Sequence, residues 1–261
     1  MPGLTIERQG AVAILVIENE GRRNCLTAQM WQQLEPTLDS IAADETVTVL
    51  VVTGAGDDFS AGADIRDLDQ ILNAPTGSDG GWITAAENAL ARFSKPTIAA
   101  IDGYCVGGGW ELAGACDIRI ASSRSSFGVT PSRIGIVYPL SGIERLVAIA
   151  GPAVAKLLLF SGDLVSASDA QRFGMVSRVV EADSLLPEAL AFATHLANRS
   201  QLSIRAMKEI VDAIASGGDA EAVASRWQAE VNASDEPAIG AAAFIDKERP
   251  EFTWRAPSSH R

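Results

Sequence analysis

Histidine and cysteine are scarce in this chain of 261 residues, and their placement excludes several kinds of active site. The two histidines, His195 and His260, lie near no glycine-rich motif, which gives a Ser-His-Asp hydrolase or a metal site little support. The three cysteines are an odd number, lack CxxC spacing and lie in apolar or glycine-rich surroundings. We therefore expect no metal, and we expect buried free thiols in a reducing cytoplasm at Cys25, Cys105 and Cys116.

Long apolar runs and an excess of positive charge are missing as well. No stretch approaches the roughly 18 consecutive apolar residues that a membrane helix needs. The first residues lack the basic segment and apolar core of a secretory signal. The formal net charge of −12 disfavours nucleic acid as a partner, because the phosphate backbone requires a basic face. These absences predict a cytoplasmic protein that binds neither membranes nor nucleic acid.

Two glycine-containing segments carry the strongest functional signal. Residues 59–65 read Phe-Ser-Ala-Gly-Ala-Asp-Ile, and residues 102–112 read Asp-Gly-Tyr-Cys-Val-Gly-Gly-Gly-Trp-Glu-Leu. Each runs from an apolar, β-rich stretch through small residues into a predicted helix, which leaves backbone N–H groups free to hold a negative oxygen. Two such turns that face one another would form an oxyanion hole from main chain alone. Glu111, three residues after Gly108, is close enough to act as a base beside it.

The first two thirds of the chain alternate short apolar segments with helical patterns. Between the first two strands, Thr27 is a plausible N-cap for a helix whose apolar face repeats at helical spacing from Met30 to Ile41. Continuous apolar strands separated by helices favour an α/β arrangement with a covered sheet. The predicted strands are residues 12–17, 48–53, 96–101 and 175–180.

The last third reads as helices without intervening strands. Short terminal helices need a surface on which to pack, so we expect a subunit interface in this region. Residues 68–83 contain a run rich in Gly, Pro, Ser and Asn, which predicts a mobile loop forming a lid or pocket wall. The predicted terminal helices are residues 182–198, 202–216, 220–232 and 237–247.

Five ordered sequence features together resemble the enoyl-CoA hydratase/isomerase (crotonase) superfamily over nearly the whole chain. A single run of three glycines is weak evidence, but ordered segments at these separations are strong. The matching features are the Asn24-x-Leu26 turn, the 59–65 segment, the Gly-rich stretch from Gly103 to Ile118, Phe127-Gly128, and the tail from Phe244 to Phe252.

This resemblance implies an α/β, crotonase-like (ClpP/crotonase) fold, a spiral of β-β-α units. Residues 1–195 would form the core with the acyl-CoA site, and residues 196–261 a C-terminal helical trimerisation region. The protein would then be a homotrimer or a hexamer built as a dimer of trimers. The resemblance implies a lyase or isomerase of acyl-CoA metabolism. Its ligand would be an acyl-CoA thioester, with coenzyme A entering as part of the substrate and no tightly bound cofactor.

The resemblance also assigns roles to residues of this chain. The family's two oxyanion donors fall on the backbone N–H groups of Ala63 and Gly108, with Glu111 as the proton-transfer residue. Phosphates would meet basic residues near Arg22 and Arg23, together with Lys247 from a neighbouring subunit. The expected coenzyme A contacts are Arg23, Leu26, Ala61, Asp64, Ile65 and Lys247.

One departure limits the prediction of the reaction. The two-carboxylate hydratases carry a second Glu in a Phe-Gly-x-Pro-Glu pattern, and alignment on Phe127-Gly128 places Pro131 at that position. No acidic residue occurs between Ile118 and Ile143, so hydration would be slower unless a lid residue such as Asp67 or Asp69 substitutes.

The segment that contains Pro131 leaves three functions open. Its Thr-Pro-x-x-x-Gly-x-x-Tyr pattern, residues 130–138, resembles the branch that includes methylmalonyl-CoA decarboxylase, in which Tyr138 would lie beside the thioester. A single Glu suffices for double-bond migration, and decarboxylation needs only one proton donor. The alternatives are therefore a hydratase or isomerase, an acyl-CoA decarboxylase, and a non-catalytic acyl-CoA-binding paralogue.

Overall fold

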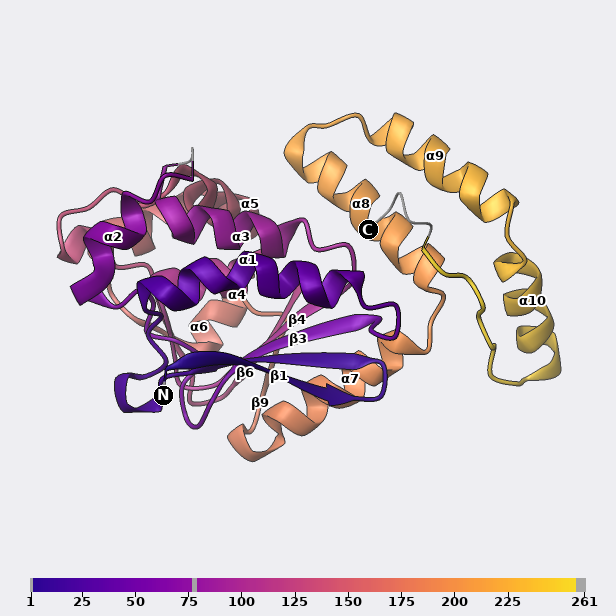
Figure 1. The fold of residues 1–261 in the computed structure, drawn as a ribbon, viewed down its shortest axis with the longest axis horizontal. Helices are drawn as coiled ribbons and strands as arrows, with labels where there is room; N and C mark the ends of the chain where they lie inside the picture. Colours follow the sequence, from indigo (N-terminus) through magenta and orange to yellow (C-terminus); the bar gives the residue numbers. More distant parts are fainter. Residues whose placement is uncertain (1, 77–78, 257–261) are drawn as a thin grey trace.

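The computed structural model describes residues 2–76 and 79–256, and its centre is a six-stranded sheet (Figure 1). The strand order is β1-β2-β3-β4-β6-β9, in which β1 pairs antiparallel with β2 and all other neighbours are parallel. The strands are β1 (Gly3–Gln9), β2 (Val12–Glu18), β3 (Val49–Gly54), β4 (Thr97–Ile101), β6 (Ile118–Ser122) and β9 (Arg178–Val180).

A smaller sheet follows the carboxyl end of β4. In it β5 (Tyr104–Val106) pairs parallel with β7 (Ser126–Gly128), which pairs antiparallel with β8 (Val165–Ser166). Because β5 leads directly into the glycines at 107–109, this sheet fixes the start of the second glycine-containing segment.

Helices cover both faces of the six-stranded sheet. Alternate residues of β3 enter different cores: Leu50 and Val52 pack with α1 and its neighbours, whereas Val49 and Val51 pack with α7. Figure 1 shows α1 and α3 on one side of the sheet and α7 on the other. A parallel sheet buried on both faces reads as continuous apolar strands, which is the pattern in the sequence. The helices of these layers are α1 (Ala28–Ala43), α2 (Leu68–Leu72), α3 (Gly81–Ala91), α4 (Gly108–Ala115), α5 (Leu140–Ser161), α6 (Ala167–Arg172) and α7 (Leu185–Ala197).

The first helix begins where its sequence predicts. The Thr27 hydroxyl oxygen accepts a hydrogen bond of 3.3 Å from the Met30 backbone N–H, which satisfies one of the free donors of the first turn. The buried residues include Met30, Leu34, Leu38 and Ile41, at the predicted spacing. The predicted N-cap and apolar face of α1 are therefore confirmed.

The C-terminal helices form an arm beside the layered core. They are α8 (Gln201–Ser216), α9 (Ala220–Asn232) and α10 (Glu236–Asp246). In Figure 1, α9 and α10 lie to the right of the sheet and apart from it. Exposed apolar side chains lie on α8 and α10, namely Met207, Val211, Ile214, Phe244 and Ile245. The predicted terminal helices are confirmed, while the boundary at residue 195 and the trimerisation role stay predictions.

The prediction of a loop over residues 68–83 is wrong for much of its length. The segment contains all of α2, whose Ile71 is fully buried, and the first turn of α3. The Gly and Pro signals mark only the connection between these helices, and Gly77 and Ser78 of that connection lie outside the described residues.

One strand prediction also needs correction and strand β1 was not predicted at all, whereas the cysteine prediction is confirmed. Residues 175–177 are not part of a strand, because only Arg178–Val180 pairs with β6. Strand β1 escaped prediction because this edge strand is largely exposed and has no clear apolar alternation. All three cysteines are buried free thiols, as predicted. No helix among residues 2–76 and 79–256 has both the length and the apolarity to cross a membrane.

Candidate active site

Three chain segments lie side by side at the carboxyl ends of the parallel strands. Leu26 forms a parallel bridge with Ala63, and Ser60 forms one with Cys105. The Leu26 N–H donates to the Gly62 carbonyl at 2.8 Å, and the Val106 N–H donates to the Ser60 carbonyl at 3.0 Å. The two glycine-containing segments therefore run next to one another, although the bridge partners Ser60 and Cys105 are 45 positions apart in the sequence.

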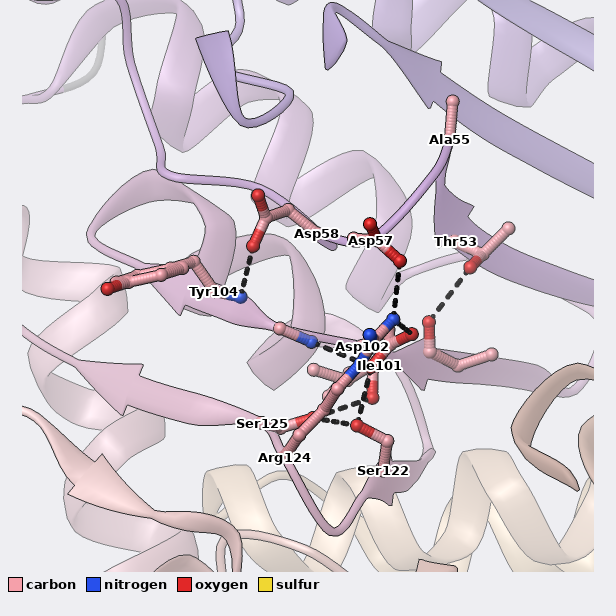
Figure 2. A network of polar contacts seen from close by, with 12 residues as sticks. Thr53, Ala55, Asp57, Asp58, Ile101, Asp102, Tyr104, Ser122, Arg124 and Ser125 are labelled. Atoms are coloured by element: carbon pink, nitrogen blue, oxygen red, sulfur yellow. Dashed lines mark hydrogen bonds and ion pairs between the residues drawn. The ribbon is translucent and has the colours of Figure 1, made fainter. Parts of the chain in front are cut away.

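A network of hydrogen bonds and ion pairs links the residues at the start of the two glycine-containing segments (Figure 2). The Arg124 guanidinium bridges the carboxylates of Asp57 and Asp102, with N–O distances of 2.7 and 2.6 Å. The Asp58 carboxylate accepts the Tyr104 backbone N–H at 2.8 Å. Each glycine-containing segment is thus fixed at its entry by side chains from the other or from the β6–β7 connection.

The backbone N–H groups of Ala63 and Gly108 are close neighbours. A Cβ built on Gly108 would lie 3.5 Å from the Ala63 nitrogen, and one built on Gly62 would lie 2.9 Å from the Gly108 nitrogen. Gly107 has φ 56° and ψ −119°, a conformation that favours glycine, and it turns the chain into α4. Within the described ranges neither N–H donates to a protein acceptor. Neither donor is therefore satisfied by the described part of the chain.

Glu111 is buried beside this pair without a hydrogen-bond partner. Its residue is 2% exposed, and both carboxylate oxygens lack a partner among the described residues. It lies in the first turn of α4, opposite Gly142 of α5: a Cβ on that glycine would stand 2.9 Å from Oε1 of Glu111. Burial raises the pKa of the Glu111 carboxyl well above its ordinary value, and the charge of Glu87 raises it further. The arrangement favours a neutral carboxylic acid.

Tyr138 lies against the same glycine. A Cβ on Gly142 would stand 2.8 Å from Cε1 of the Tyr138 ring, so only glycine leaves room for the ring here. The Tyr138 hydroxyl donates to the Gly107 carbonyl at 2.9 Å. Burial, then the charge of Glu111, raises the pKa of Tyr138 well above its ordinary value. The structure thus brings Gly108, Glu111 and Tyr138 together.

A buried ion pair near Glu111 was missed from the sequence. Glu87 of α3 is fully buried, and its carboxylate accepts Arg145 Nε at 2.7 Å and the Ser141 hydroxyl at 2.8 Å. Both partners come from α5, more than 50 positions away. The available signal was the position of Glu87 itself, on the apolar helix face shared with Ile83 and Leu90.

The site contains no second carboxylate from the predicted segment. Pro131 is buried in a short 3-10 helix, Pro131–Arg133. Each of the two suggested substitutes accepts a hydrogen bond from another part of the protein. The Asp67 carboxylate accepts the Ala28 backbone N–H at 3.0 Å at the start of α1, and the Asp69 carboxylate accepts the Asn73 amide at 2.8 Å.

Five of the six expected coenzyme A contacts lie together. The Ala61 N–H donates to the Arg23 carbonyl and the Asp64 N–H to the Leu26 carbonyl, each at 2.8 Å. Ile65 follows with 69% of its surface exposed, and the Arg23 guanidinium lies 4.1 Å from the centre of the Tyr104 ring. This edge of the site combines an apolar contact with a cation.

Asp64 gathers further cations at this edge. Its carboxylate accepts hydrogen bonds from the Arg66 guanidinium and lies 3.5 Å from Arg22. The hydrogen bond from Arg66 is the main reason that the pKa of Asp64 falls to about 2. Lys247, the sixth expected contact, directly follows α10, which lies at the opposite end of the molecule from α2 in Figure 1.

A cavity of about 700 Å³ opens beside Tyr138. Its walls come from the end of α2, from the α2–α3 connection and from the segment before α5, and Leu72, Ile136 and Val137 are among its apolar members. Its described lining residues include one acidic residue, Asp79, and no basic residue. The cavity therefore suits an uncharged group better than an anionic one.

With this geometry established, comparisons with known proteins identify the family. The model of the enoyl-CoA hydratase/isomerase family matches residues 7–255. The chain belongs to the enoyl-CoA hydratase/isomerase family. The 2,3-dehydroadipyl-CoA hydratase of Escherichia coli is 32% identical, with 98% of this chain and 100% of that protein covered. The family resemblance predicted from the sequence is confirmed.

Solved structures of the family confirm the predicted fold. One member of the enoyl-CoA hydratase/isomerase family superposes with a TM-score of 0.93 at 36% identity, covering 98% of both chains. A family protein from Hyphomonas neptunium gives a TM-score of 0.90 at 34% identity, again covering 98% of both. The α/β, crotonase-like prediction is therefore correct, and the chain is an acyl-CoA enzyme of the hydratase/isomerase type.

Proposed function

We propose that this family member stabilises a thioester enolate between the backbone N–H groups of Ala63 and Gly108, with Glu111 transferring the proton. The observation that carries the proposal is the pair of neighbouring amides without protein acceptors, next to a buried carboxyl group that also lacks partners. Unpaired polar groups are costly in a protein interior, so three at one point indicate a ligand.

The chemistry follows from where charge develops. Proton removal at Cα, or addition at Cβ, places negative charge on the thioester carbonyl oxygen. A preorganised donor at that oxygen contributes on the order of 10²–10³ in rate. Main-chain donors also cannot lose their protons at working pH. Glu111, held toward its neutral form, can give a proton to the enolate and, once ionised, take one from Cα.

Hydration or isomerisation is the leading reaction. Its support is the membership in the enoyl-CoA hydratase/isomerase family, together with a single proton-transfer residue that suffices for double-bond migration. Hydration in this site requires Glu111 to serve both the attacking water and Cα, because Pro131 supplies no carboxylate.

Decarboxylation is the second candidate, favoured by the raised pKa of Glu111, which disfavours its ionised form. Loss of CO₂ from a malonyl-type thioester leaves its electron pair on the substrate as the enolate. One proton from Glu111 then completes the product, so no second acid or base is needed. Asp79 in the neighbouring cavity opposes this candidate, because it would repel the substrate carboxylate.

Parallel assays with crotonyl-CoA and methylmalonyl-CoA separate the candidates. Loss of enoyl absorbance that disappears in Glu111→Ala supports hydratase or isomerase chemistry. CO₂ release from methylmalonyl-CoA supports decarboxylation: its loss in Glu111→Ala identifies Glu111 as the proton donor, and its survival points to another proton source. Binding of both thioesters without any product supports the non-catalytic paralogue. Glu209→Gln is a matched control, since Glu209 pairs with Arg226 of α9 in the C-terminal arm.

We also propose that the coenzyme A portion lies along Arg23, Leu26, Ala61, Asp64 and Ile65, with Lys247 supplied by a neighbouring subunit of a cytoplasmic trimer or hexamer. The exposed apolar faces of α8 and α10 support the assembly. Light scattering on the wild type and on Phe244→Asp tests it. A monomeric wild type contradicts the trimer.

A further inference from the structure

The peptide group that joins Gly107 and Gly108 has a carbonyl that is hydrogen-bonded within the described part of the protein and an N–H that is not. Its carbonyl oxygen accepts two hydrogen bonds, from the Tyr138 hydroxyl at 2.9 Å and from the Glu111 backbone N–H at 3.1 Å. Its N–H is the Gly108 donor, and a Cβ on Gly108 would lie 3.5 Å from the Ala63 nitrogen. Any group that acts on the carbonyl therefore acts on the donor through the same amide.

Hydrogen bonds to an amide carbonyl polarise the whole amide. Such chains strengthen each bond by roughly 10–30%. They also fix the plane of the peptide, which matters here because glycine on both sides places little restriction on rotation. The Glu111 N–H comes from the helix itself, so the Tyr138 hydroxyl is the only side-chain bond that holds this carbonyl among the described residues.

Neighbouring residues hold the Tyr138 hydroxyl in this position. Pro139 follows directly, and a residue before proline has restricted backbone freedom. Gly142 leaves the space that the ring fills, with a Cβ there only 2.8 Å from Cε1. Burial raises the pKa of the phenol, so the hydroxyl stays protonated and remains a donor.

We infer that Tyr138 is a positioning residue that orients and polarises the Gly108 N–H through the Gly107 carbonyl. Its hydroxyl acts on the enolate through the peptide, and not by a direct hydrogen bond to the substrate. The inference rests on the proposed function, in which Gly108 donates to the thioester oxygen. It differs from the expectation that Tyr138 contacts the thioester directly.

Tyr138→Phe tests the inference by removing one hydroxyl while keeping the ring. The probe is butyryl-CoA labelled with ¹³C at the carbonyl, a saturated thioester, observed by infrared difference spectroscopy on the bound protein. In the wild type the carbonyl band should move to lower frequency. In Tyr138→Phe that shift should shrink by roughly a tenth to a third, and kcat should fall roughly threefold to tenfold with little change in KM.

Thr53→Val is the matched control. The buried Thr53 hydroxyl, labelled in Figure 2, donates to the Ala100 carbonyl at 3.0 Å, which is the same kind of bond between strands β3 and β4 of the sheet. Its loss should lower the melting temperature without moving the carbonyl band. A fluorinated tyrosine at position 138, a stronger donor of the same shape, should increase the shift and keeps the test valid if the Phe variant folds poorly.

Three outcomes contradict the inference in different ways. An unchanged band shift in Tyr138→Phe overturns the role of Tyr138 but leaves the oxyanion site intact. A raised KM with an unchanged band shift replaces it with direct substrate contact. The absence of any shift in the wild type overturns the proposed function itself, because the two amides would then not hold the thioester oxygen.

Discussion

Glu87→Gln should lower the pKa of Glu111 and move the pH profile of the enzyme toward acid. In the wild type the fully buried Glu87 carboxylate binds Arg145 Nε at 2.7 Å and the Ser141 hydroxyl at 2.8 Å. Its charge adds to burial in raising the pKa of Glu111, and the charge of Arg145 opposes this. Neutralising Glu87 therefore removes the repulsion and leaves the Arg145 charge uncompensated, so both changes act in the same direction.

The size of the effect follows from the ion pair. Removal of one like charge beside the buried Glu111 should lower its pKa, because less repulsion then opposes its ionisation. Gln keeps an acceptor for Arg145, whose side chain is 26% exposed and can reach solvent. The loss of stability should therefore be about 1–3 kcal/mol, less than the 3–5 kcal/mol expected when a buried partner is removed outright.

The assay is the pH dependence of kcat/KM with crotonyl-CoA. The limb that belongs to Glu111 is identified first, as the one lost in Glu111→Gln. In Glu87→Gln this limb should move to lower pH, whether Glu111 acts as acid or base. Glu209→Gln, which also loses an ion pair with arginine, should leave it in place. A limb that stays fixed or moves to higher pH in Glu87→Gln refutes the reasoning.

Further predictions concern the same site. Glu111→Gln should raise the melting temperature at pH 7. The pKa of Glu111 is raised in the folded state, so above the ordinary pKa of 4.5 the unfolded chain ionises more readily and the folded state loses stability. Thermal scans should show that the gain from the substitution vanishes below that pH. Gly62→Ala places a Cβ 2.9 Å from the Gly108 nitrogen and should reduce kcat at least about 100-fold, whereas Gly217→Ala, equally left-handed but in open space, should cost only about 1–2 kcal/mol. Arg23→Ala should raise KM for crotonyl-CoA and weaken its dependence on salt.

Local features were the most predictable part of this fold. Thr27 and the spacing from Met30 to Ile41 predict α1 because capping and periodicity act within a few residues. The glycine-containing segments were recognisable for the same reason. The loop prediction over 68–83 failed because the burial of Ile71 is a tertiary contact that outweighs neighbouring turn residues.

The cluster around Glu111 shows what single-sequence reasoning misses. The sequence points to Glu111 through its distance from the glycines. It does not show that Gly142 touches both Glu111 and Tyr138, nor that Arg145 reaches Glu87, because these contacts depend on how α3 and α5 cross. The position of Glu87 on an apolar helix face was a sequence signal for a buried partner, without naming the partner.

The close packing of Gly142 on Glu111 has a consequence for the fate of the hydrogen that the enzyme moves. A carboxyl that is 2% exposed and packed against α5 has little contact with solvent. If Glu111 transfers the proton, as proposed, a hydrogen taken from one carbon of the acyl chain should be returned to another before deuterium from the medium replaces it. Product formed in heavy water would retain protium from the substrate. This retention distinguishes a carboxyl that is shielded from solvent from one that exchanges with it.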